Sequence, residues 1–220
     1  MMPEISQKYD FNEFQNYLES GNFEKCSEIV KAILAESDDV KKLYDEVLKR
    51  SLYRIGELWE ASKISVATEH MASAIVETIL NEVYFKIMTQ SKINKTVVVT
   101  CTENEFHQIG IKMVSDVFEM NSWHVHFLGA NTTSEELLSL IEKVNPDMLA
   151  ISLSIPFNFP NLEKMLVKVN AQFPDLFVLV GGQAFLHVGT ETLKKYKNVI
   201  YKSDLKGLDE FLKIEMSGKV

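Results

Sequence analysis

The sequence has few cysteines, little positive charge and no long apolar run. Only Cys26 and Cys101 occur among 220 residues, which excludes a disulfide scaffold and fits a reducing compartment. Acidic residues outnumber basic ones by 31 to 23, so the chain repels nucleic acid phosphates, and no local basic patch offsets this. No apolar run approaches the ~18 residues of a membrane span, and the N-terminus has no signal-peptide core. We therefore expect a soluble, cytoplasmic protein without direct nucleic acid or membrane contacts.

Glycine and proline are scarce in the first 90 residues, which hold only Gly21, Gly56 and Pro3. Apolar residues recur there at three- and four-residue steps, which is the helical period. The spacing predicts helices over about 11–20, 23–36 and 40–61, and a fourth that Ser65 caps and that runs to about 88. Short connections between four helices indicate an antiparallel four-helix bundle, which we assign to a domain of residues 1–90.

The hydrophobic period changes at Thr96, where a continuous β-rich run begins. Strands are predicted over 96–101, 123–128, 148–152, 176–180 and 199–201, and helices over 109–120, 134–144, 162–173, about 191–196 and 205–216. This alternation predicts an α/β domain over residues 91–220, after a polar, basic linker over 89–95. We expect a five-stranded parallel sheet of flavodoxin-like (Rossmann-like) order that binds its ligand at the carboxyl ends of the strands.

The loop after the first strand carries a carboxylate and an imidazole two residues apart, Glu105 and His107. Glu105 can accept the proton of one ring nitrogen, which orients the ring and makes the other nitrogen a better metal ligand. Gly110 would let a bulky group approach the start of the next helix. The alternative is a solvated or capping histidine. One imidazole cannot make a zinc site, and it suffices for a metal only where a macrocycle supplies the other ligands.

Two further blocks follow at fixed distances. Forty-one residues separate Gly110 from Ser152-Leu153-Ser154, and 26 more precede Gly181-Gly182. This pattern resembles the cobalamin-binding signature Asp-x-His-x-x-Gly, about 41 residues, Ser-x-Leu, 26 to 28 residues, Gly-Gly. Taken one at a time, Ser152 could be an ordinary strand residue and the paired glycines a plain turn. The joint spacing favours the signature.

The resemblance implies a role for each block. In the family the histidine, here His107, displaces the nucleotide base of the cofactor and becomes the lower cobalt ligand. The displaced tail enters a slot lined by the serine, here Ser152, and by Gly181 and Gly182. Two positions depart from the pattern: Glu105 stands where Asp is commonest, and Ser154 replaces the Leu of Ser-x-Leu, which makes that part of the tail pocket more polar.

The helical half carries a second resemblance. The spacing of its polar and aromatic residues is similar to that in the cap of light-sensing cobalamin repressors: Trp59 is followed by nine residues and then by Glu69-His70. The resemblance implies that Trp59 covers the upper side of the corrin, while Glu69 and His70 meet the upper ligand, with His70 as a candidate second cobalt ligand. The alternative is a core Trp59, a helix-start Glu69 and a surface His70. In the repressors a histidine that captures cobalt after illumination directly follows the tryptophan; here that residue is Glu60. His124 and His126 share one face of the second strand, and we interpret them as structural or exposed.

Three functions are compatible with these features. The leading hypothesis is a cobalamin-binding photosensory regulator that holds adenosyl- or methylcobalamin between the bundle and the sheet. Only about ten residues precede the first predicted helix, so we expect no DNA-binding domain and an output through a protein partner or self-association. The second is a corrinoid methyl carrier that serves a methyltransferase system. The third is an interaction protein that kept the fold and lost the cofactor.

Overall fold

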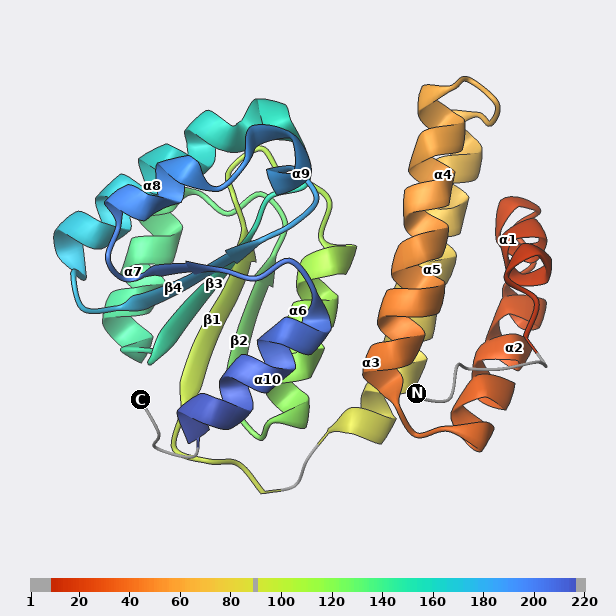
Figure 1. The fold of residues 1–220 in the computed structure, drawn as a ribbon, viewed down its shortest axis with the longest axis horizontal. Helices are drawn as coiled ribbons and strands as arrows, with labels where there is room; N and C mark the ends of the chain where they lie inside the picture. The colour runs from red at the N-terminus through yellow and green to blue at the C-terminus, as the bar shows by residue number, and fades with distance from the viewer. Residues whose placement is uncertain (1–8, 89–90, 217–220) are drawn as a thin grey trace. The chain divides into compact units, whose positions relative to one another are not determined.

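The computed structural model describes residues 9–88 and 91–216. The chain separates into two compact units, residues 1–87 and 88–220, and each has its own core. Figure 1 shows helices alone in the first unit and a helix-flanked sheet in the second. Within the described residues, no helix is long and apolar enough to cross a membrane.

The first unit consists of helices whose starts the sequence marks with capping side chains. α1 (Phe11–Glu19) and α2 (Phe23–Glu36) begin after Asp10 and Asn22, which accept hydrogen bonds from backbone N–H groups of the first turn. α5 (Val66–Ile87) begins after Ser65, whose Oγ accepts from the N–H of Thr68. It packs against α1, α2 and α4 (Arg50–Glu60). The predicted helical region is confirmed.

The third predicted helix is not a uniform α-helix. It runs as α3 (Val40–Leu43), a π-helical segment η1 (Tyr44–Lys49) and α4 without a break in direction (Figure 1). Tyr44, Val47 and Leu48 of the π-segment are all buried. The segment contains neither proline nor glycine, so no local signal distinguishes its wider turns from α-helical ones.

The second unit is built on a five-stranded parallel sheet in the order β2-β1-β3-β4-β5. The strands are β1 (Thr96–Cys101), β2 (His124–Gly129), β3 (Met148–Ser152), β4 (Phe177–Gly181) and β5 (Val199–Tyr201). β1, β3 and most of β4 are buried, as continuous apolar runs require in a sheet covered on both faces. The predicted flavodoxin-like order is confirmed.

Helices cover both faces of this sheet. α6 (Ile109–Met120) and α10 (Leu205–Met216) lie on one face, and α7 (Ser134–Val144) and α8 (Phe159–Gln172) on the other (Figure 1). α8 starts three residues before its predicted start, because Pro160 is tolerated in the first helical turn. The predicted helix at 191–196 is the 3₁₀ segment η3 (Glu191–Lys195), and the short α9 (Phe185–Val188) was not predicted. This topology brings the loops after β1, β3 and β4 to one edge of the sheet.

Candidate cofactor site

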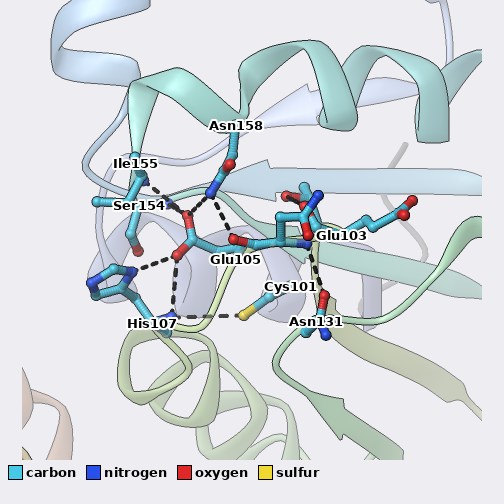
Figure 2. Close-up of polar contacts among 10 residues, drawn as sticks. Cys101, Glu103, Glu105, His107, Asn131, Ser154, Ile155 and Asn158 are labelled. Carbon is cyan, nitrogen blue, oxygen red and sulfur yellow. Dashed lines mark hydrogen bonds and ion pairs between the residues drawn. The ribbon is translucent and has the colours of Figure 1, made fainter.

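The loop between β1 and α6 holds His107 against a buried carboxylate. The Nδ1 atom of His107 lies 2.5 Å from Glu105 Oε1, which also accepts the backbone N–H of His107 at 3.1 Å (Figure 2). The side chain of Glu105 is fully buried, whereas that of His107 is 56% exposed. Because an ionised carboxylate only accepts hydrogen bonds, Nδ1 of His107 is the donor in this pair, and the bond fixes the orientation of the ring. The loop therefore offers one oriented imidazole ligand at the sheet edge.

Glu105 also ties this loop to the loop after β3. Its Oε2 accepts the backbone N–H groups of Ser154 at 3.0 Å and Ile155 at 2.9 Å, and Nδ2 of Asn158 lies 3.5 Å away (Figure 2). Burial by itself would raise the pKa of Glu105, but the hydrogen bonds from His107, Ile155 and Ser154 outweigh it and lower the pKa to about 2. The carboxylate is thus ionised at neutral pH and fixes the positions of two loops at once.

Asparagines hold the same loop from two other elements. Asn104 adopts a φ of 64°, and its N–H donates to Oδ1 of Asn131, itself at a φ of 52° in the loop after β2. The N–H of Asn131 donates to the carbonyl of Glu105, and Nδ2 of Asn158 donates to the carbonyl of Asn104. Sequence reasoning missed these residues. The tolerance of Asn for left-handed backbone was the available signal for Asn104 and Asn131, and nothing local marked Asn158.

The second and third blocks of the signature lie side by side. Ser152 pairs with Gly181 in the parallel register of β3 and β4, and the N–H of Leu153 donates to the carbonyl of Gly181 at 3.0 Å. Gly182 has a φ of 112°, and a Cβ there would lie 2.2 Å from the carbonyl oxygen of Leu153. Only glycine fits this crossing of two backbones. Ser152 is buried, and Ser154 meets the His107 loop through its backbone N–H.

The start of α6 is open, and large apolar side chains are exposed in the segments that follow three of the strands. A Cβ built on Gly110, at the start of α6, meets no heavy atom within 4 Å. Three large apolar side chains are exposed there: Phe106 in the loop after β1, Phe157 in a 3₁₀ turn after β3, with 89% exposure, and Leu186 in α9 after β4. Exposed side chains of this size at the carboxyl ends of parallel strands, where such sheets bind ligands, are suited to contact a sizeable, partly apolar partner.

Within the helical unit, the three predicted cap residues lie on one helical hairpin. Trp59, about half exposed, is in the last turn of α4, and Glu69 and His70 are in the first turns of α5. Glu69 Oε2 lies 3.5 Å from His70 Nε2, and its Oε1 accepts from Ser73 Oγ at 2.9 Å. All three side chains remain accessible, with His70 largely exposed. Their role toward a ligand stays a prediction.

In the part of the chain that the structure describes, no cluster of three or more His, Cys, Asp or Glu residues is arranged to hold a metal ion. His124 and His126 are exposed on the edge strand β2. Cys101 is fully buried, and burial raises the pKa of its thiol to about 12. The donor set at His107 therefore suits a metal that brings its remaining ligands with it.

Comparison with known proteins covers both units. Residues 95–202 match a family described as "B12 binding domain", and residues 11–84 match a second family of the same description. The chain is similar to two HTH-type transcriptional repressors of Myxococcus xanthus. It is 28% identical to CarA over 123 residues (54% of this chain, 41% of CarA) and 26% identical to CarH over 161 residues (73% of this chain, 53% of CarH). It thus spans about half the length of these curated relatives.

Among solved structures, the fold is similar to the monomethylamine corrinoid protein of Methanosarcina barkeri. The TM-score is 0.78 at 14% sequence identity, over 92% of this chain and 96% of that one. At this identity the likeness shows a shared fold and nothing finer.

Proposed function

Because this chain belongs to the cobalamin-binding proteins that join a helical B12 binding domain to a sheet-based one, we propose that it binds cobalamin with His107 as the lower cobalt ligand. In this arrangement His107 takes the place of the cofactor's own nucleotide base. The observation that carries the proposal is the half-exposed imidazole oriented by a fully buried, ionised carboxylate at the carboxyl edge of a parallel sheet.

The residues of the candidate site suit cobalamin in three respects. The site offers one imidazole, and a corrin ring supplies the four equatorial nitrogen ligands of its cobalt. Phe106, Phe157 and Leu186 expose apolar surface for the macrocycle, and Gly110 leaves the start of α6 uncovered. Ser152 and Gly181, which pair in the sheet register, and the adjoining Gly182 are the proposed contacts of the displaced tail, and Ser154 adds a polar residue two positions after Ser152.

We further propose that Trp59, Glu69 and His70 contact the upper ligand and that the protein acts as a cobalamin-dependent, light-responsive regulator. Bound cobalamin would supply a cobalt–carbon bond that light can break. An indole face can stack on an adenine, and the Glu69 carboxylate can accept hydrogen bonds from ribose or amine groups. His70, beside Glu69, is the candidate for an upper cobalt ligand. The regulator would pass its signal on through a protein partner or through self-association.

A corrinoid methyl carrier that serves a methyltransferase is the second candidate. It is compatible with the fold shared with the monomethylamine corrinoid protein, and the lower histidine would serve both functions equally. The two candidates differ at the upper ligand. A methyl group offers neither a stacking face nor hydrogen-bonding edges to Trp59 and Glu69.

The decisive experiment measures binding of adenosyl- and methylcobalamin in the dark, by absorption, to the wild type and three variants. His107→Ala should weaken both cofactors and remove the spectrum of histidine-bound cobalamin, whereas His126→Ala, an exposed histidine on β2, should change neither. Trp59→Ala should weaken adenosylcobalamin by roughly 5- to 150-fold, the equivalent of 1–3 kcal/mol, and methylcobalamin far less.

The outcomes separate the parts of the proposal. An unchanged spectrum and affinity in His107→Ala would refute the ligand assignment. Equal losses for both cofactors in Trp59→Ala, or none, would remove the case for an adenosyl-specific cap and favour the methyl carrier. Green light on the adenosylcobalamin complex should then change the spectrum and the size of the assembly if the protein is a light-responsive regulator.

A further inference from the structure

Lys202 continues a row of residues at the carboxyl ends of the strands. In the parallel register Cys101 pairs with Ser152, and Ser152 pairs with Gly181. Lys202 directly follows β5, and its N–H donates to the carbonyl of Val180 at 3.1 Å. A Cβ built on Gly181 would lie 3.0 Å from the carbonyl oxygen of Lys202, so the two residues are neighbours. Since Ser152 and Gly181 are proposed contacts of the cofactor's displaced tail, Lys202 lies beside that part of the site.

This row faces the side of the sheet that α6 and α10 cover. One residue earlier on their strands, Ile151, Val180 and Tyr201 pack with residues of α7 and α8 in the core on the opposite face. Successive residues of a strand point to opposite faces, which places the row on the α6 and α10 side. The ammonium of Lys202 lies 4.9 Å from the ring centroid of Phe211 on α10, in agreement with this placement. The row thus ends in a positive charge beside α10.

No other lysine or arginine lies in the segments that directly follow the five strands, which are 102–108, 130–133, 153–155, 182–184 and 202–204. Among the described residues, Lys202 forms no ion pair with a carboxylate. Asp204, the nearest acidic residue in the chain, caps α10: its Oδ1 accepts the N–H of Gly207 at 2.7 Å, and its Oδ2 accepts from Ser203 Oγ at 2.7 Å. In a chain of net charge −8, Lys202 is therefore the cation of these segments that an anion reaching this edge of the sheet would meet.

The position and charge of Lys202 indicate which part of the cofactor it meets. The nucleotide tail of cobalamin is joined to the corrin through a phosphodiester, which carries a negative charge at neutral pH. A cation–π contact such as that with Phe211 is weaker than a charge-assisted hydrogen bond to a phosphate oxygen, and the lysine stem is flexible. We propose that Lys202 binds the phosphodiester of the displaced tail. This inference rests on the proposed function, because it takes His107 as the lower ligand and the tail as displaced.

The test compares three corrinoids that share an adenosyl upper ligand and differ only in the tail. Adenosylcobalamin has the complete tail, adenosylcobinamide phosphate keeps a phosphate without the nucleoside, and adenosylcobinamide has neither. Their binding to the full-length chain is measured in the dark by absorption. Lys202→Gln should weaken the first two by about tenfold, as expected for one lost charge-assisted hydrogen bond, and leave the third unchanged. The loss should shrink as sodium chloride is raised, because salt screens a partly exposed charge pair.

Three further variants separate this proposal from the proposed function. Lys202→Arg keeps the charge and should bind adenosylcobalamin like the wild type. Lys206→Gln removes an exposed lysine in the first turn of α10, 3.9 Å from Glu210, and as the matched control should change none of the three affinities. His107→Ala should weaken all three corrinoids, because it acts at the cobalt. A wild type that binds no corrinoid would overturn both proposals. Binding that depends on His107, combined with a Lys202→Gln variant that spares adenosylcobalamin or weakens adenosylcobinamide equally, would overturn the assignment of Lys202 alone.

Discussion

Glu105 shows how one side chain can organise the site. Its two carboxylate oxygens accept hydrogen bonds from the ring and backbone of His107 and from the N–H groups of Ser154 and Ile155. The related signature commonly has Asp at this position. The additional methylene of Glu lets a single buried carboxylate reach both loops, so the departure from the pattern has a structural role of its own.

We therefore predict that Glu105→Asp lowers the free energy of unfolding of the cobalamin-free protein. A shorter side chain cannot satisfy both loops, and each buried N–H left without a partner costs roughly 1–3 kcal/mol. Urea denaturation measures the effect, with Glu103→Asp, two residues earlier and only partly buried, as the control. Equal stability of the Glu105→Asp variant and the wild type would contradict the bridging role.

At the scale of elements, two glycines of the signature have opposite surroundings. Gly182 combines a φ of 112° with a close approach to the backbone of Leu153, so it fixes how the loop after β4 crosses the loop after β3. Gly110 lies in the first turn of α6 with open space where its side chain would be. The first glycine is required by the fold, whereas the space beside the second would accept a larger side chain.

This contrast predicts opposite effects of adding one methyl group. Gly182→Ala should destabilise the chain by more than the 1–3 kcal/mol typical of strained backbone alone, because the backbone of Leu153 must also move. Gly110→Ala should stabilise the cobalamin-free protein by about 0.5–1 kcal/mol, since alanine favours the helix. Under the proposed function it should also weaken cobalamin binding. Urea denaturation measures the stability of each variant, and titration with cobalamin in the dark measures its affinity. A Gly110→Ala variant that binds cobalamin normally would place the ligand elsewhere.

At the scale of the whole molecule, each unit contains one buried cysteine. Cys26 lies in the helical unit and Cys101 in the sheet unit, where its Sγ is 3.6 Å from the carbonyl oxygen of His107. Burial raises the pKa of the Cys26 thiol to about 11 and that of Cys101 to about 12. Since the thiolate is the reactive form, each cysteine reacts only when its own unit opens.

The single-cysteine variants Cys101→Ser and Cys26→Ser therefore report on the two units separately. In the native protein both thiols should react with a maleimide at least about 100-fold more slowly than in urea, because labelling waits for local or global opening. Under the proposed function, cobalamin should slow the labelling of Cys101 further and protect Cys26 much less. Labelling at the denatured rate in either unit would show that its cysteine is not enclosed.

Local sequence determined most of the secondary structure and indicated where the candidate site lies. The caps at Asp10, Asn22 and Ser65 and the change of hydrophobic period at Thr96 depend on neighbours in the chain, so helices and strands were predictable from it. The spacing of Gly110, Ser152 and Gly181 indicated cobalamin binding, and the family matches confirm that resemblance. The ends of β2 and β4 differ from the predicted strand ends by one residue. Residues Tyr44–Lys49 and 191–195 are helical as predicted, but they form a π-helix and a 3₁₀-helix instead of α-helices.

Tertiary structure alone decided which distant groups meet Glu105 and which face of α5 is left exposed. Ser154 and Asn158 lie 49 and 53 residues from Glu105, and no periodicity reports a contact across such a distance. The same holds for Asn131, which supports the His107 loop from the end of another strand. On α5, Ile75 and Phe85 are both large and apolar, so by residue type each is equally suited to a core. Only the packing of α1, α2 and α4 around it determines that Ile75 is buried and Phe85 is exposed.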